Sequence, residues 1–403
     1  MRRLIFFIAW WALAATASQA QQAKQALFAD IDEILKDLAQ ITGLPATRKV
    51  ASDTIDRAGL KKFLEDRIKE AVKPEEIRAE EVTLKKLGLV PSTFDLKKTT
   101  IDLLTEQAAA FYDYHKKKLF LLESNSSFTE RPVLVHELSH ALADMHFNLS
   151  KYIGKSRSDD ASVARQAVME GQATWLMTEY MLFKVGTSLT KAAGMADSMN
   201  RMAGAGGGGF PVFDAAPLYL RESLVFPYTK GFSFQHAVIL KMGQQGFGEV
   251  FRNPPLSAQQ ILHPEKYFSK TIPTKLEPPK VKLRGYRELV AGGVGEFDHQ
   301  MLLRTHTSEE ESKAAEKWRG ASYRILENKK DKNLTVLCYA SEWQDETSAR
   351  KFFELYQTVL RKKWNQFEIS RRTESEVDGN GDDGRFQLRR SGNIVTSLEG
   401  LPK

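Results

Sequence analysis

Hydrophobic and polar positions recur with two different periods along this chain, and the changes of period divide it into segments. Residues 24–108 repeat apolar positions at helical spacing among lysines and glutamates, which predicts a run of helices. Ser52 is expected to cap one of these helices, and Pro74 suits the first turn of another because its missing N–H is not needed there. The pattern therefore predicts a helical N-terminal region at residues 21–108.

The period shortens between residues 110 and 123, where the runs AFYDY and KLFLL are separated by lysines. Short aromatic and aliphatic runs broken by a polar turn are typical of a β-hairpin. Helical spacing returns at residues 130–147 and 162–184, and a further helix is expected to begin at Tyr228. Four consecutive glycines within residues 201–210 predict a loop, because ordering glycine costs the most backbone entropy.

The C-terminal part has a different pattern. Three prolines indicate a linker over residues 271–281. Beyond it, alternating runs predict strands, Asp345 is expected to cap one amphipathic helix, and a hairpin turning at Ser391-Gly392-Asn393 closes the chain. Residues 282–403 are therefore predicted to form a C-terminal α+β accessory domain. The fold class predicted for the whole chain is α+β, with a mostly helical domain that contains a small sheet, followed by this C-terminal α+β domain.

The first residues have the features of a secretory signal. Two arginines precede an apolar run at residues 4–15, and small residues precede a predicted cleavage after Ala20. A helix of twelve residues spans about 18 Å, which is too short for a hydrocarbon core of about 30 Å. We therefore expect residues 1–20 to be a signal peptide, the protein to be exported to the periplasm or the extracellular space, and no stable membrane span after its removal. An uncleaved N-terminal anchor is the alternative.

Composition narrows the function classes. The chain is 42% hydrophobic and 27% charged, as in ordinary globular proteins, and its net charge of +7 is spread over 403 residues. No basic stripe with interleaved aromatic residues is present, so nucleic acid is not an expected partner. Cys338 is the only cysteine, which excludes an internal disulfide, and its place in an alternating run indicates a core residue. No pattern in the sequence fixes an oligomeric state.

The strongest chemical motif is His-Glu-Leu-Ser-His at residues 136–140. On an α-helix, His136 and His140 lie about 40° apart around the axis and one turn apart along it. Both imidazoles can therefore occupy corners of one tetrahedral zinc site, while Glu137 lies beside the ion and can hold and deprotonate a zinc-bound water. Two ordinary core histidines are the alternative reading.

A catalytic zinc site needs a third protein ligand and keeps its fourth position for water. Glu170 lies in an otherwise apolar helix, where a lone carboxylate is costly unless it is paired or bound to a metal. Gly171 beside it permits close approach of two helices. Glu179 is the nearest rival, but its amphipathic neighbours are those of a surface residue. The predicted zinc ligands are therefore His136, His140 and Glu170.

The run HELSHAL followed by MEGQATW resembles the gluzincin branch of the zinc metallopeptidases, and the Tyr228-x-x-Gly231 motif resembles one found in small bacterial peptidase-MA-like families. The resemblance implies that residues 109–270 form a gluzincin-like metallopeptidase domain. It also implies that Lys118–Leu122 is a strand edge that pairs with substrate backbone. Tyr228 would then donate a hydrogen bond to the carbonyl oxyanion.

The sequence departs from the gluzincin pattern in one respect. Many gluzincins carry an aspartate four residues beyond the ligand glutamate, where it orients a histidine, but Thr174 stands at this position. Asp144, four residues after His140, could serve instead, or it could face solvent. Both alternatives are left open.

Together these features predict an exported zinc-dependent peptidase that acts on a peptide or protein substrate. Glu137 would take a proton from the zinc-bound water and later pass it to the leaving amine. One alternative keeps the zinc without the activity, as a catalytically inactive envelope binding or assembly factor. A second alternative is an envelope interaction protein without metal, whose C-terminal domain is the functional part.

Overall fold

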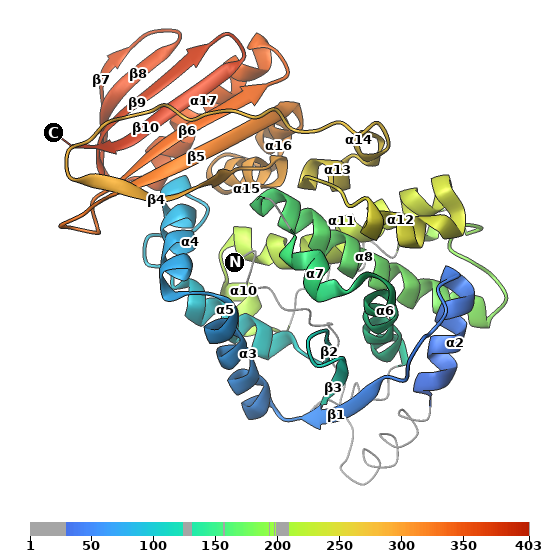
Figure 1. Ribbon diagram of the computed structural model, residues 1–403. Helices are drawn as coiled ribbons and strands as arrows, with labels where there is room; N and C mark the ends of the chain where they lie inside the picture. The colour runs from blue at the N-terminus through green and yellow to red at the C-terminus, as the bar shows by residue number, and fades with distance from the viewer. Residues whose placement is uncertain are drawn as a thin grey trace.

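The computed structural model describes most of the chain, namely residues 30–123, 131–155, 158–192, 194–196, 198 and 209–402. The predicted signal peptide and Gly206 to Gly208 of the predicted loop lie outside these residues. In the part that is described, no helix is long and apolar enough to cross a membrane. Figure 1 shows helices arranged around a small sheet and, at the other end of the molecule, a larger sheet.

A three-stranded sheet lies among the N-terminal helices, with the strand order β1-β3-β2. Its strands are β1 (Ala51–Ile55), β2 (Ala110–Asp113) and β3 (Lys118–Leu122). β2 and β3 pair antiparallel, which confirms the hairpin predicted at residues 110–123. β1 pairs in parallel with β3.

β1 contradicts the prediction that residues 21–108 are helical throughout. Pairing with β3 satisfies the backbone of this segment, and such tertiary pairing overrides a weak local preference. Ser52 consequently lies inside a strand and caps no helix. Helix α3 (Arg57–Ala71) is capped by Asp56, whose carboxylate accepts a hydrogen bond from Gly59 N at 2.6 Å.

Some of the remaining helical elements of this part pack against the small sheet, and others lie farther from it (Figure 1). They are α2 (Ile31–Thr42), α4 (Pro74–Leu87), α5 (Leu96–Gln107), α6 (Arg131–Phe147), α7 (Leu149–Gly154), α8 (Asp159–Lys184), α10 (Pro211–Ala215), α11 (Leu218–Met242), the 3-10 turn η2 (Gly243–Gln245), α12 (Gly246–Arg252), α13 (Ala258–Leu262) and α14 (Pro264–Phe268). Pro74 opens α4 as predicted, and α6 and α8 confirm the two predicted long helices.

The prediction that a helix begins at Tyr228 is wrong. α11 begins ten residues earlier and carries Pro227 in its interior. A proline normally ends or kinks a helix, which is why the sequence pattern placed a boundary here. Tyr228 therefore lies in the middle of α11.

The C-terminal sheet is antiparallel, with seven strands in the order β4-β5-β6-β10-β9-β8-β7. Its strands are β4 (Tyr286–Gly293), β5 (Trp318–Asn328), β6 (Thr335–Trp343), β7 (Phe367–Arg372), β8 (Glu376–Gly381), β9 (Gly384–Ser391) and β10 (Ile394–Leu401). The helical elements of this part are α15 (Glu296–His306), α16 (Glu309–Ser312), η3 (Lys313–Lys317) and α17 (Glu346–Lys363). Asp345 caps α17 as predicted, and α17 packs on one face of the sheet. The fold class is thus α+β, as predicted.

The two parts share one hydrophobic core. A single cluster of buried side chains continues from α4, α8 and α11 through α15 to α17 and the inner face of the large sheet. The segment at residues 271–281 contains no helix or strand and runs along β5, where Thr274 N donates to Arg319 O at 2.9 Å. The C-terminal part is therefore packed against α11 and against α8, the helix that carries Glu170.

Candidate metal centre

Two histidines of α6 form the first half of the cluster. His136 and His140 lie on one face of the helix, and their Nε2 atoms are 3.2 Å apart. Both side chains are buried. The helical spacing deduced from the sequence is therefore realised, with both Nε2 atoms turned to the same point.

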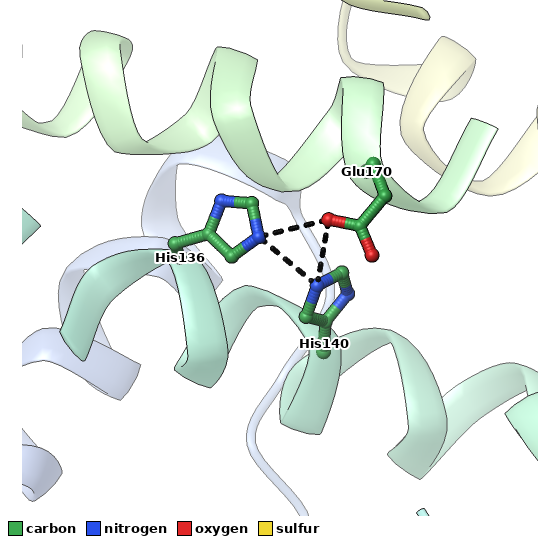
Figure 2. A group of neighbouring side chains, drawn as sticks. All are labelled: His136, His140 and Glu170. Carbon is green, nitrogen blue, oxygen red and sulfur yellow. Dashed lines mark hydrogen bonds and ion pairs between the residues drawn. The ribbon is translucent and has the colours of Figure 1, made fainter. Parts of the chain in front are cut away.

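α8 brings the third residue to the same point. Glu170 Oε2 lies 3.0 Å from His136 Nε2 and 3.5 Å from His140 Nε2. Figure 2 shows the three side chains turned toward one another from the two helices. Adjacent ligand atoms of a tetrahedral site with metal–ligand distances of about 2.0–2.1 Å are about 3.3 Å apart. The three ligand atoms lie within 4.8 Å of one another, so their separations suit one small cation.

The approach of α8 to α11 depends on two glycines. A Cβ atom at Gly171 would lie 2.1 Å from the carbonyl carbon of Gly231, and a Cβ atom at Gly231 would lie 2.1 Å from Ala167 O. Only glycine fits at such distances. The close helix approach predicted from Gly171 is confirmed, and its partner is the glycine of the Tyr228-x-x-Gly231 motif.

This contact places Tyr228 beside the cluster. The Tyr228 ring is half-buried and stacks on the His136 ring, with centroids 6.0 Å apart and planes inclined by 22°. The structure thus brings Tyr228 together with the three predicted ligands.

Glu137 is completely buried and points beside the cluster rather than into it. Its Oε2 atom accepts a hydrogen bond from Tyr112 N at 2.7 Å, whereas Oε1 has no hydrogen-bond partner among the described residues. Burial raises the pKa of Glu137 to about 7, although the neighbouring His136 acts in the opposite direction. A carboxylate with one fixed and one free oxygen is suited to exchanging a proton.

The pKa of Glu170 is shifted downward, in the opposite direction to that of Glu137. Burial alone would raise its pKa, but the imidazoles of His140 and His136 lower the pKa of Glu170 to about 2. Its Oε1 atom is buried without a hydrogen-bond partner within the described part of the chain. A buried oxygen left without a partner is costly, and a cation would remove that cost. Two imidazoles and a carboxylate form a donor set that zinc accepts readily.

Two further expectations concern neighbouring carboxylates. Glu179 is not a surface residue, because its side chain is buried and accepts a hydrogen bond from Leu189 N at 2.7 Å. Glu179 anchors the segment that follows α8 and lies away from the His136, His140 and Glu170 group. Asp144 is also buried, and its two oxygens bind side chains and an N–H group outside the cluster.

Thr174 does not take over the role that an aspartate has in many gluzincins. Its Oγ1 atom is buried and makes no hydrogen bond to any residue that the structure describes. Thr174 therefore fits the helix packing but does not orient a histidine side chain.

The strand edge implied for Lys118–Leu122 is not available. β3 is the central strand, paired with β1 on one side and β2 on the other. Leu122 N donates to Ala109 O, and the antiparallel alternation therefore turns the backbone groups of Ala110 and Tyr112 away from β3. The edge next to α6 belongs to β2, and no sequence signal marked Tyr112 as the residue that would contact Glu137.

Comparison with known proteins characterises only the C-terminal part. Residues 284–403 match a family described as a domain of unknown function (DUF8575). No curated protein and no solved structure matches the chain. His136, His140 and Glu170 lie outside the matched residues, so the interpretation of this group depends on its own geometry.

Proposed function

We propose that this chain is a zinc-dependent peptidase that hydrolyses peptide bonds in a peptide or protein substrate. The observation that carries the proposal is the convergence of His136, His140 and Glu170, with Glu137 beside them and one of its oxygens free. Among the described residues, no further histidine, cysteine, aspartate or glutamate joins the three. Three protein ligands leave a position open, which is typical of catalytic rather than structural zinc sites.

Zinc bound there would polarise the scissile carbonyl and acidify the attacking water. Glu137 would accept the proton of that water at Oε1, while Tyr112 N holds Oε2 in place. The same carboxyl group would then pass the proton to the leaving amine. The hydroxyl group of Tyr228 is proposed to donate a hydrogen bond to the carbonyl oxygen as negative charge develops on it.

An extended peptide is proposed to pair with the outer edge of β2. All four residues of this strand are buried, so a substrate has to displace the groups that cover this edge. The C=O and N–H groups of Ala110 and the C=O group of Tyr112 point away from β3, and β2 packs beside α6. A peptide added as a further strand would be held by main-chain hydrogen bonds, which are indifferent to side-chain identity.

The rival reading, an inactive zinc-containing binding or assembly factor, predicts a closed four-ligand site. The three-residue cluster favours the open site instead. An inhibitor that chelates open zinc would bind the proposed peptidase and would not bind a closed site.

Replacement of Glu137 by glutamine tests the proposal. Glu137→Gln should keep zinc but lower hydrolysis of an unstructured peptide library by about 10³-fold, because the general base is lost. Glu179→Gln is the matched control, since it changes another buried glutamate that lies away from the cluster. Products are identified by mass spectrometry. Full turnover by Glu137→Gln would contradict the assigned role.

A further inference from the structure

We infer that Tyr112 and Asp144 form a clamp that sets the position of Glu137 relative to the β2 edge, so that both are positioning residues for the proposed reaction. The inference rests on the proposed function and adds residues that the zinc motif does not include. A single tyrosine, Tyr112, holds α6 at two points.

Tyr112 contacts α6 through both its main chain and its side chain. Its backbone N donates to Glu137 Oε2 at 2.7 Å, and its hydroxyl group donates to Asp144 Oδ2 at 2.9 Å. Residues seven positions apart lie on the same face of a helix, two turns from each other. One residue of β2 therefore spans two turns of the helix that carries both histidines, which fixes the register between strand and helix.

Asp144 is itself held from several sides. Its side chain is fully buried and binds Arg48 Nη2 at 2.9 Å, Lys117 Nζ at 2.7 Å and Leu149 N at 3.0 Å. Hydrogen bonds between ionised groups are shorter and stronger than neutral ones. The carboxylate is thus a fixed point, and the hydroxyl group of Tyr112 is anchored to it.

The same network holds the hairpin that carries the β2 edge. Arg48 also donates to the Tyr112 hydroxyl group at 3.2 Å, and Lys117 lies in the turn between β2 and β3. Lys117 adopts a left-handed backbone conformation with φ of 56°, which is uncommon for residues other than glycine. Its side chain reaches Asp144 from that turn, so Tyr112 and Lys117 together tie the turn end of the hairpin to α6.

The consequence for catalysis is geometric. Glu137 must keep one oxygen toward the attacking water and the other on Tyr112 N while the substrate lies along β2. Loss of the Tyr112 hydroxyl group would leave the N–H group and the ring in place but release the edge from Asp144. Displacements of this kind lower the rate of the chemical step more than they lower substrate binding.

The test compares Tyr112→Phe with Tyr152→Phe in the full-length protein. Tyr152 is another buried tyrosine, and its hydroxyl group contacts Val250 O away from the cluster. We expect Tyr112→Phe to lower kcat about tenfold, with KM changed less than about twofold and zinc content unchanged. Tyr152→Phe should change neither kinetic constant.

A second readout does not need activity. Hydrogen exchange at the residue 112 amide, measured on metal-free protein, should be faster in Tyr112→Phe and in Asp144→Asn than in wild type or Tyr152→Phe. Wild-type amide protection in both variants, or a Tyr112→Phe kcat equal to that of Tyr152→Phe, would overturn the inference. If wild type hydrolyses no peptide, the proposed function fails while the exchange measurement still decides whether the clamp exists.

Discussion

Glu170 and Glu399 are both buried carboxylates, and the difference between their surroundings separates the two parts of the molecule. Glu399 Oε1 accepts hydrogen bonds from Tyr356 at 2.7 Å and Ser397 at 2.8 Å, and Oε2 is paired with Lys363. Glu170 Oε2 faces two imidazoles, and its Oε1 atom has no hydrogen-bond partner among the residues described. Glu399 belongs to a completed network, whereas the Glu170 cluster is one that a cation would complete.

The completed network also joins the two parts of the chain. Lys86 of α4 is buried, pairs with Asp383 Oδ2 at 2.9 Å and donates to Thr335 O at 3.0 Å. Burial lowers the pKa of Lys86, although the pairing with Asp383 opposes this shift. Lys363 donates to Lys86 O at 2.9 Å. Buried charges at this junction pair between α4 and the large sheet, whereas those at the candidate metal centre are proposed to serve chemistry.

The largest expected effect comes from changing these two glutamates in parallel. Glu399→Gln leaves the buried Lys363 cation poorly compensated, and removing one partner of a buried pair typically costs about 3 kcal/mol. The loss in unfolding free energy should be the same with excess zinc and after chelation. Glu170→Gln should instead remove the additional stability that zinc gives to the wild type.

Denaturant unfolding of wild type and both variants, with and without zinc, measures these differences. A Glu399→Gln variant that loses less than about 1 kcal/mol would show that the buried pair has little energetic weight. Equal zinc stabilisation of Glu170→Gln and wild type would contradict the distinction between the two carboxylates.

Replacing His299 is expected to have a smaller effect, on the pH dependence of the unfolding free energy. His299 is buried in the C-terminal part and contacts Gly295 O and the Tyr339 hydroxyl group. Burial lowers the pKa of His299 below its ordinary value of 6.5. The unfolded chain therefore binds a proton more readily than the folded one, and stability is lost as the pH falls through about 6.5.

The contribution of His299 is isolated by comparing the pH dependence of unfolding between pH 7 and 5 in wild type and His299→Gln. The wild type should lose more stability over this interval, by at most about 1.4 kcal/mol per pH unit. Parallel pH profiles would show that His299 titrates alike in both states.

Much of this arrangement could be predicted from the sequence because it depends on local spacing. The two histidines need only a helix, and an isolated glutamate in an apolar run indicated the third corner of the cluster. Gly171 indicated close helix packing for the same reason. The C-terminal strands and α17 followed from alternation and from the cap at Asp345.

What could not be predicted depends on pairing between distant segments. The strand at β1 forms only because β3 lies beside it, and that pairing makes β3 central instead of an edge. The hydrogen bond from Tyr112 to Glu137 is made by a backbone N–H group, which every residue except proline possesses. A pattern of side chains therefore cannot indicate which residue makes this hydrogen bond.

The central claim is that the His136, His140 and Glu170 cluster binds one zinc ion. The most direct measurement is the metal content of purified protein after exposure to zinc and removal of the excess, for wild type and His140→Ala. We predict about one zinc ion per wild-type chain and substantially less in the variant, since a catalytic site needs all three protein ligands. Wild-type protein without stoichiometric zinc, or equal zinc in both proteins, would contradict the claim.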